Sequence, residues 1–231
     1  MSADELIDTT EMYLKAIYEL EEDGVTPLRA RSVERLGHSG PTVSQTIARM
    51  ERDGLVMVRA DRRLDLTERG RALVADVMRK HRLAELLLLH VIGLQRSEVH
   101  REACRWEHVM SVAVEERLKQ ILGQPETDPF GNPIPGMGVH DSQEFSVETL
   151  VRDDREHVGR LVRIGEPIQA DQELLSDFET AQLRPGQRIR VVKQDSGYRL
   201  CAILPEGRDT AEQICVWIED IYASHLFLVA E

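Results

Sequence analysis

Residues 29–53 have the sequence RARSVERLGHSGPTVSQTIARMERD, and this stretch decides the fold of the N-terminal part of the chain. Residues 29–36 form a short helical pattern, Ser39, Gly40 and Pro41 interrupt it, and residues 42–53 form a second pattern that Gly54 ends. Two short helices separated by a tight turn are typical of a helix-turn-helix, whose second helix enters the major groove of DNA. We therefore predict a DNA-binding motif.

The sequence on either side of this motif predicts a winged version of it. Before it, apolar residues between positions 4 and 22 recur at helical spacing until Gly24, which predicts a first helix. After it, residues 55–58 and 64–66 are short β-prone runs joined through Asp61, Arg62 and Arg63. We expect these runs to form a small hairpin with arginines at its tip.

Three further helices are expected after the hairpin. Thr67 is a suitable N-cap for a long helix that continues to residue 92 and stops at Gly93. Ser97 caps a second helix reaching about residue 110, and Ser111 starts a third that ends near residue 122. These helices contain more leucine and valine than a compact DNA-binding domain needs for its own core. We therefore expect a subunit interface and a homodimer.

The rest of the chain predicts a separate β-rich domain. Residues 125–138 contain four prolines and three glycines and resemble a linker. Beyond residue 147, the β-prone runs 159–164, 188–192, 198–204 and 226–229 alternate with turns, which indicates a small barrel. The expected fold is mainly α with small β elements. It comprises a winged helix-turn-helix domain (1–75), a helical dimerisation domain (76–140) and a C-terminal β-barrel domain (141–231).

Composition and charge narrow the class of protein. The longest apolar stretch, residues 83–94, contains Glu85 and His90 and is too short to cross a bilayer, so no membrane association is expected. Three scattered cysteines do not suggest a disulfide framework, which favours a reducing compartment and a cytoplasmic protein. We expect Cys201 and Cys215, both in predicted strands, to be plain core residues.

The net charge of −12 argues at first against DNA binding, but the charge is unevenly distributed. Residues 1–28 contain eight acidic residues and one basic residue, whereas residues 29–71 contain ten arginines and six acidic residues. The basic block coincides with the predicted helix-turn-helix and wing. These elements would contact the DNA phosphates, and such contact requires positive charge. Within this block, residues 42–53 present polar side chains, among which Gln45 suits adenine and Arg49 suits phosphate or guanine.

A second group of residues suggests a metal site. Cys104, Glu107 and His108 are spaced three and four apart on a predicted helix and so share one face. A thiolate, a carboxylate and an imidazole together suit a borderline divalent transition ion. His81 and Glu85 form an i,i+4 pair on the preceding helix. A buried cysteine beside a solvated Glu-His pair would give the same pattern by itself.

Other functions for these residues are conceivable from the sequence. Cys104 beside His108 could have a lowered pKa and act as a peroxide sensor. A metalloenzyme would need an open coordination position, a general base and a substrate pocket, and no separate catalytic constellation is present, so we expect no enzyme. A winged-helix regulator that responds to a ligand other than a metal is the third alternative.

Four segments carry a resemblance to a known family: residues 8–14 (DTTEMYL), 39–46 (SGPTVSQT), 78–85 (MRKHRLAE) and 102–110 (EACRWEHVM). They resemble the diphtheria toxin repressor and iron-dependent regulator family. The resemblance is close across residues 4–136. It is thinner afterwards, where residues 164–169 (IGEPIQ) and 183–186 (LRPG) still align with the family's SH3-like module.

The resemblance implies an iron(II)-activated homodimeric repressor that binds palindromic operators of iron uptake and homeostasis genes. It implies two metal sites per subunit, with Co(II), Ni(II), Zn(II) or Mn(II) as substitutes in vitro. The primary site would use Met12, Cys104 through its side chain and carbonyl, Glu107 and His108. The ancillary site would use His81, Glu85, His100 and, from the SH3-like domain, Glu166 and Gln169.

The resemblance also implies contacts with operator DNA and leaves open whether one or two dimers bind each operator. The implied contacts are Thr9, Arg29, Ala30, Ser39, Pro41, Thr42, Gln45, Arg49, Arg52 and Arg62. Because Met12 lies on the first helix, metal binding would order this helix and set the spacing of the recognition helices. Family members that bind an anion at the ancillary metal have a serine where this chain has Asp128, which puts that anion in doubt.

Overall fold

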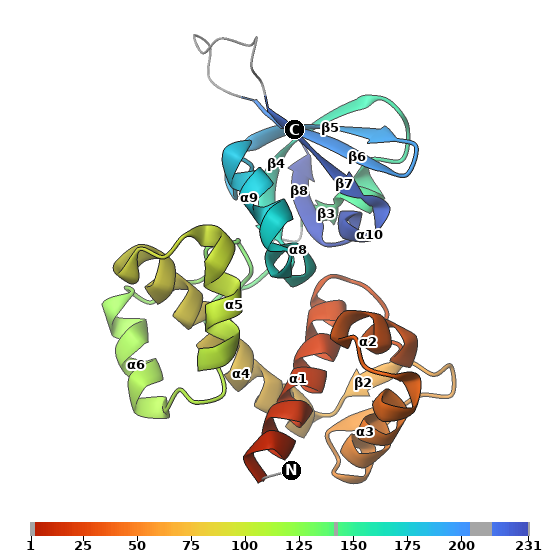
Figure 1. The fold of residues 1–231 in the computed structure, drawn as a ribbon, viewed down its shortest axis with the longest axis vertical. Coiled ribbons are helices and arrows are strands. Elements are labelled where there is room, and N and C mark those ends of the chain that lie inside the picture. Colours follow the sequence, from red (N-terminus) through yellow and green to blue (C-terminus); the bar gives the residue numbers. More distant parts are fainter. Residues whose placement is uncertain (1–2, 141–142, 204–213, 231) are drawn as a thin grey trace.

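The computed structural model describes residues 3–140, 143–203 and 214–230, and the side chains from Thr9 onward. Figure 1 shows three parts: a helical part with a small hairpin, a second helical part, and a part built on an antiparallel sheet. The first part contains α1 (Ala3–Glu22), α2 (Arg29–Leu36), α3 (Gly40–Arg52), β1 (Val56–Val58) and β2 (Leu64–Leu66).

The first part has the predicted winged helix-turn-helix architecture. Ser39 is the N-cap of α3 and Pro41 lies in its first turn, so the helix begins at Gly40, two residues earlier than predicted. Val43, Ile47 and Met50 recur on one face of α3 and are fully buried. They belong to a core that also contains Tyr13, Leu14 and Ile17 of α1. Strands β1 and β2 pair antiparallel, which confirms the predicted hairpin.

The second part is helical and extends away from the hairpin. It contains α4 (Glu68–Leu86), a π-helical segment η1 (Leu87–Ile92), α5 (Arg96–Trp106) and α6 (Val112–Ile121). Thr67 caps α4 and Ser111 caps α6, as predicted. Helix α5, however, starts at Arg96 and ends at Trp106, and Val109 and Met110 both donate their N–H to the Trp106 carbonyl. Glu107 and His108 therefore lie in the turn after α5 and not on the helix.

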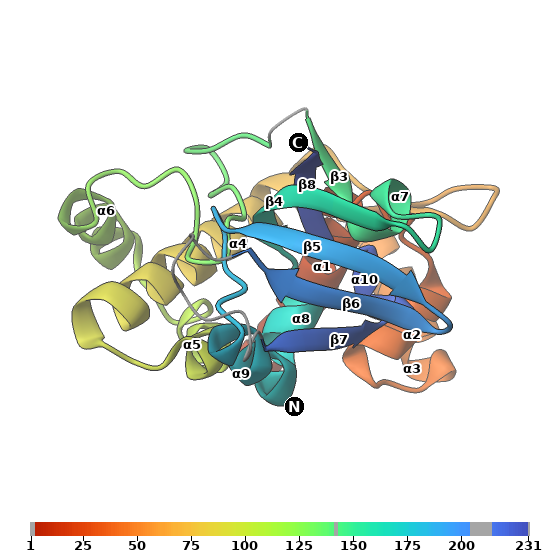
Figure 2. The same ribbon diagram turned by 90° about the horizontal axis from the view of Figure 1, so that it is seen from above.

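The third part is a six-stranded antiparallel sheet with short helices packed on it (Figure 2). Its strand order is β3-β8-β4-β5-β6-β7. The predicted runs 159–164, 188–192 and 226–229 lie within β4, β5 and β8, whereas the run 198–204 starts in β6 and ends at a residue outside the described ranges. Its elements are β3 (Glu144–Ser146), α7 (Val147–Leu150), β4 (Glu156–Ile164), α8 (Glu166–Ala170), α9 (Gln172–Thr180), β5 (Arg188–Gln194), β6 (Gly197–Ala202), β7 (Cys215–Glu219), α10 (Asp220–Ala223) and β8 (Leu226–Ala230).

The expectation that Cys201 and Cys215 are plain core residues is wrong. They are directly opposed in the β6–β7 register, with their Cα atoms 4.4 Å apart, and form a disulfide. Both cysteines were expected in strands, but the pairing of those two strands was not predicted, so the opposition of the cysteines was not foreseen. Adjacent antiparallel strands bring opposed side chains within bridging distance.

The proline-rich segment 125–138 is packed and is not a loose linker. Phe130 and Ile134 are fully buried, and the Phe130 carbonyl accepts a hydrogen bond from the Ile164 N–H. Gly131 has a φ of +86°, and a Cβ there would lie 1.9 Å from the Val162 carbonyl oxygen. The segment therefore joins the second part to β4 through a close backbone contact.

The sheet part also contacts the end of α1. The Arg163 guanidinium on β4 is buried, lies over the Phe227 ring and pairs with Asp23 at 2.6 Å. Asp23 also accepts a hydrogen bond from His225. Figure 1 shows α8 of the sheet part above α1 and beside α5, so all three parts meet there. In the described residues, no helix is long and apolar enough to cross a membrane.

Candidate metal centre and DNA-binding surface

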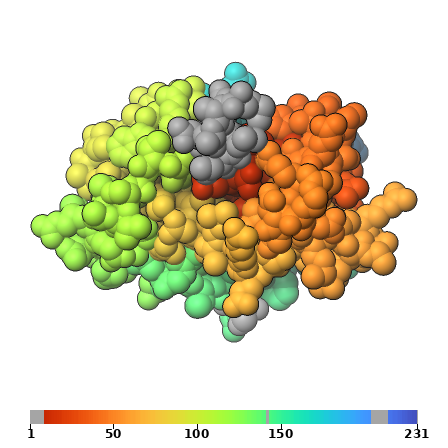
Figure 3. Space-filling view, turned by 90° about the horizontal axis from the view of Figure 1, so that it is seen from below, coloured from red at the N-terminus to blue at the C-terminus, as the bar shows by residue number. Residues whose placement is uncertain are grey.

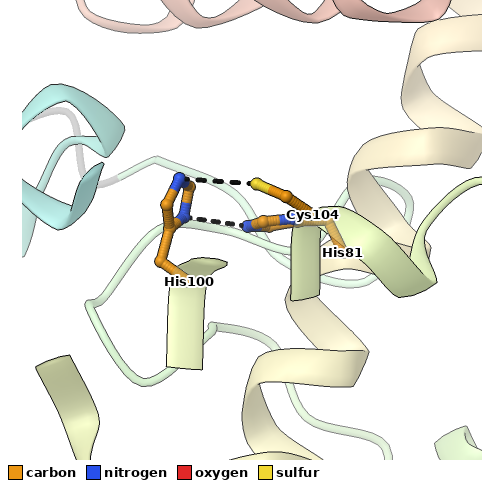
Figure 4. Close-up of side chains that lie close together, drawn as sticks. All are labelled: His81, His100 and Cys104. Atoms are coloured by element: carbon orange, nitrogen blue, oxygen red, sulfur yellow. Dashed lines mark hydrogen bonds between the residues drawn. The ribbon is translucent and has the colours of Figure 1, made fainter. Parts of the chain in front are cut away.

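Metal-ligating side chains from α4 and from the region of α5 converge where the three parts meet. His81 Nε2 lies 2.9 Å from Glu85 Oε1. It also lies 3.2 Å from His100 Nδ1, and His100 Nε2 lies 3.6 Å from the Cys104 sulfur (Figure 4). Ligand atoms of His81, His100 and Cys104 all lie within 4.8 Å of one another. Glu107 joins them, because its Oε2 lies 2.5 Å from His81 Nδ1. We call His81, Glu85, His100, Cys104 and Glu107 the donor cluster.

The predicted primary-site residues face one cavity of about 870 Å³. Met12, Cys104, Glu107 and His108 all line it. The Met12 side chain is 38% exposed and so is accessible from this cavity. His108 Nδ1 hydrogen-bonds to Glu11 on α1, and its Nε2 lies 3.2 Å from Glu107. The residues are thus gathered around one space, although the turn after α5 and not a helical face positions Glu107 and His108.

Helix α8 brings two further predicted ligands to the same junction. Glu166 is buried, and one of its carboxylate oxygens lies 3.7 Å from the Arg82 guanidinium. Gln169 is also buried and donates its amide N–H to the Ile164 carbonyl. Gly165 is the N-cap of α8 and Pro167 lies in its first turn, so α8 begins directly after β4.

Two buried oxygen atoms support a cation at this junction. Among the described residues, Glu85 Oε2 and Gln169 Oε1 accept no hydrogen bond. An unpartnered buried acceptor is costly, and carboxylate and amide oxygens are ordinary metal ligands. The imidazoles of His81 and His100 lie beside Glu85. The residues present therefore fit a divalent transition ion.

Lys15, which sequence reasoning missed, is part of this site. Its ammonium extends from α1 and lies 3.0 Å from Glu107 Oε2, 3.2 Å from His81 Nδ1 and 3.7 Å from the Cys104 sulfur. It is also 3.3 Å from Glu166 Oε2. The signal was present in the sequence, because Lys15 is the one basic residue among residues 1–28.

Negatively charged side chains of the donor cluster lie next to positively charged ones. Burial raises the pKa of the Cys104 thiol, but Lys15, His100 and His81 outweigh burial and lower this pKa to about 5. Burial lowers the pKa of His100, but the Cys104 thiolate and Glu85 outweigh burial and raise it to about 10. Burial likewise opposes ionisation of Glu85, whose pKa the two histidines lower to about 2. The cluster is therefore an ionised network in which thiolate and carboxylates face cations.

Asp128 is buried close to the donor cluster. Its carboxylate accepts hydrogen bonds from the N–H groups of Phe130 and Asn132 and from the Asn132 side chain, and lies 3.7 Å from Arg82 Nε. Burial and the nearby Glu85 raise its pKa to about 7, against the effects of Arg82 and Asn132. A carboxylate of the chain itself thus lies beside Arg82, at the position whose aspartate put an external anion in doubt.

The predicted operator-contacting residues lie on the winged helix-turn-helix. Figure 3 shows this part (orange) on one side of the molecule and α6 (green) on the other, with α4 between them. Arg49 donates to the Thr10 hydroxyl at 3.2 Å, and Arg62 has a φ of +69° at the tip of the hairpin. The exposed residues are Ala30, Ser39, Pro41, Thr42, Gln45, Arg52 and Arg62, whereas Thr9, Arg29 and Arg49 are partly buried.

Two family models match the chain. A model described as the iron dependent repressor N-terminal DNA binding domain matches residues 5–64. A model described as the iron dependent repressor metal binding and dimerisation domain matches residues 67–136. Their boundary falls at the end of the hairpin.

Curated proteins and solved structures agree with these models. The chain is 55% identical over 201 residues to the iron-dependent repressor IdeR of Mycobacterium tuberculosis, covering 84% of this chain and 87% of that protein. It is 54% identical over 197 residues to the diphtheria toxin repressor of Corynebacterium diphtheriae, covering 83% and 87%. A manganese-dependent transcriptional repressor in complex with manganese is similar in structure, with a TM-score of 0.77, 28% identity and coverage of 96% and 100%.

Proposed function

The chain belongs to the iron-dependent repressor family, and from this premise we propose that it is an iron(II)-activated repressor of iron uptake and homeostasis genes. It is a metal-dependent transcriptional repressor with a DNA-binding domain and a metal-binding and dimerisation domain. Its relatives are named as repressors, which confirms the expectation of a regulator without catalysis. We propose domain boundaries at residues 75/76 and 140/141.

The observation that carries the proposal is the gathering of soft and hard donors where three parts of the chain meet. We assign Met12, Cys104, Glu107 and His108 to a primary site that links α1 to the turn after α5. We assign His81, Glu85, His100, Glu166 and Gln169 to an ancillary site that links α4 and α5 to α8. The unpartnered oxygens of Glu85 and Gln169 support the ancillary assignment.

The donor types favour iron(II) over manganese(II) at the primary site. Met12 and Cys104 supply sulfur, which a softer ion accepts more readily than Mn(II) does. Co(II), Ni(II) and Zn(II) are expected to bind in vitro, because affinity for such donors follows the general divalent order. Of the relatives, IdeR is named for iron, and the structurally similar repressor for manganese.

The contacts of α1 suggest how binding of a metal ion changes the affinity of the protein for DNA. Helix α1 carries Met12 and, through Thr10, contacts Arg49 of the recognition helix α3. Holding α1 against the turn after α5 therefore sets the orientation of α3 relative to the dimerisation helices. A bound divalent ion supplies charge neutralisation and a fixed geometry among these ligands, and its effect is limited to its differential affinity for the two orientations.

We propose that the second helical part forms a homodimer that reads a palindrome. Exposed apolar side chains lie on η1 and α6, namely Val91, Ile92, Val112, Val114 and Ile121. Helix α6, which carries three of them, lies on the side opposite to α2 and α3 (Figure 2). An exposed apolar surface of this kind suits a partner copy, and two recognition helices must then be about one turn of DNA, roughly 34 Å, or a multiple of that apart. We propose that the residues named above as implied operator contacts, from Thr9 to Arg62, touch the DNA.

Substitution of Met12 tests the primary site. We expect Met12→Ala to abolish metal-dependent DNA binding while leaving the thermal melt close to wild type, because the side chain is 38% exposed. Binding is measured anaerobically by fluorescence anisotropy with a duplex selected from a random-sequence pool, titrating Fe(II) and Mn(II) with a chelator control. Met137→Ala is the matched control and is expected to retain activation. Full activation of Met12→Ala would overturn the primary-site assignment.

A further inference from the structure

Lys15 occupies an unusual position for a lysine. It is 8% exposed, and its ammonium lies among the side chains of three different segments: α4, the end of α5 and α8. Its nearest oxygen atoms are Glu107 Oε2 at 3.0 Å and Glu166 Oε2 at 3.3 Å. Glu19, one turn further along α1, is 3.9 Å away. A buried ammonium of this kind is retained only where several anions compensate the loss of hydration.

The atoms that hold Lys15 are also proposed metal donors. Glu107 belongs to the proposed primary site and Glu166 to the proposed ancillary site, and Lys15 contacts both. His81 and Cys104, which belong one to each site, lie within 3.7 Å of the same ammonium. Lys15 thus occupies the position between the two donor sets and neutralises carboxylates that would otherwise repel each other.

We propose that Lys15 is a tethered cation that competes with the activating metal ion for Glu107 and Glu166 and thereby sets the metal concentration at which the protein responds. This inference rests on the proposed metal site. A unit positive charge that is buried a few ångströms from a divalent cation is strongly repelled by it. The Lys15 ammonium must therefore withdraw from Glu107 when that carboxylate binds a metal.

The location of Lys15 on α1 gives the competition a conformational consequence. Met12 precedes Lys15 by three residues, so the two side chains lie on the same face of the helix. One face of α1 thus supplies both a proposed ligand and the cation that opposes metal binding. When a metal ion displaces the Lys15 ammonium, Met12 takes over from Lys15 as the side chain of α1 that contacts the turn after α5.

Lys15→Met, which removes the ammonium but keeps a long side chain, tests the competition. Its matched control is Lys80→Met, which makes the same change at a lysine that directly precedes His81 on α4 but whose ammonium pairs with Asp76. Co(II) is titrated anaerobically against a competing chelator, and binding is followed by the thiolate-to-cobalt absorption of Cys104. We expect Lys15→Met to bind Co(II) roughly tenfold or more tightly than wild type, and Lys80→Met to match wild type.

Stability measurements separate competition from a purely structural ion pair. We expect metal-free Lys15→Met to melt at a lower temperature than wild type, and saturating Co(II) to reduce that difference. Unchanged or weaker Co(II) affinity with the same loss of stability would overturn the competition. If Lys15→Met does not fold, Lys15→Gln replaces it with the same expected gain in affinity. The absence of a thiolate band in both wild type and variant would instead overturn the proposed metal site.

Discussion

His100 and Cys104 carry opposite charges in the donor cluster, and binding of a metal must change the protonation of one of them. The pKa of His100 is raised to about 10, so its imidazole is protonated at neutral pH. The pKa of Cys104 is lowered to about 5, so the thiol is already ionised. Imidazole binds a metal only after it loses its proton. Metal binding near pH 7 is therefore expected to release protons, and apparent affinity is expected to rise with pH below about 10.

Calorimetry in buffers of different ionisation enthalpy measures this release. For the metal-free protein titrated with Co(II), we expect His100→Gln to release about one proton fewer than wild type and to show a weaker rise of affinity with pH. His90→Gln, at an exposed histidine on η1, is the matched control and is expected to behave like wild type. Equal proton release by His100→Gln and wild type would contradict a protonated His100.

Residue types and spacing predicted much of the donor cluster, but not its arrangement. His81 and Glu85 do lie together as an i,i+4 pair, and Cys104 does reach His100. Helical spacing failed for Glu107 and His108, because α5 ends at Trp106. Lys15 stands out in the sequence as the one basic residue among residues 1–28. Its role could not be predicted, because it depends on three segments meeting around one ammonium.

Among individual elements, the junction between the wing and α4 depends on Gly70. A Cβ on this residue would lie 2.0 Å from the Leu55 carbonyl oxygen, which is backbone and cannot move aside easily. We expect Gly70→Ala to lower the free energy of unfolding by about 1–3 kcal/mol or more, because the start of α4 must shift away from β1. Chemical denaturation followed by circular dichroism measures the change.

Gly40→Ala is the matched control for that substitution. Gly40 begins α3, and a Cβ there would meet nothing within 4 Å. We expect its effect to be within about 1 kcal/mol and in the stabilising direction, since alanine restricts the unfolded chain. Equal destabilisation by both variants would contradict the steric explanation.

The exposed apolar face of η1 and α6 gives a prediction about assembly. We expect the double variant Val91→Glu with Ile92→Glu to be monomeric at micromolar concentrations, because two carboxylates would be buried in the proposed dimer. Sedimentation velocity measures the change. Val139→Glu, at a residue that is 90% exposed, is the control and is expected to remain dimeric. A dimeric double variant would place the interface elsewhere.

Long periodic elements were predicted better than short ones. The first three helices, the hairpin and the starts of α4 and α6 follow from apolar spacing and caps. A strand at Cys215 was expected but without bounds. The buried Val216 and Ile218 on either side of the half-exposed Trp217 show the alternation that marks β7. Helices α7, α8 and α10 have five residues or fewer and depend on packing against the sheet. The π-helical segment η1 has no comparable signal in the sequence.

For the whole molecule, the Asp23–Arg163 pair connects the sheet part to α1. We expect Arg163→Met to leave Asp23 with a weaker partner and to lower the free energy of unfolding by on the order of 3 kcal/mol. The sheet part should also separate from α1, so backbone amides near residue 23 should exchange hydrogen faster. Hydrogen exchange with mass spectrometry measures this.

Arg190→Met is the control for the whole-molecule prediction. Arg190 lies on β5, adjacent to β4, and its exposed guanidinium is 3.8 Å from Glu156. Exposed pairs contribute little, so we expect an effect within about 0.5 kcal/mol and unchanged exchange near residue 23. Faster exchange in both variants would show that general destabilisation, and not loss of the contact with α1, is responsible.

How the three parts sit together was the least predictable feature. The residues that join them, such as Asp23, Arg163 and His225, are far apart in the sequence and are common on surfaces when considered singly. Their burial results from packing among elements, which local pattern does not describe. The family resemblance supplied the expected link of Glu166 and Gln169 to the donor cluster.

The Cys201–Cys215 disulfide described above has a covalent consequence. It closes residues 202–214 into a ring within the chain. A protease that cuts one peptide bond inside this ring leaves β6 and β7 joined through sulfur, so a nicked molecule migrates as a single species on a denaturing gel without reductant. Adding a thiol releases the C-terminal fragment. The integrity of purified chains is therefore judged correctly only when reduced and unreduced samples are compared.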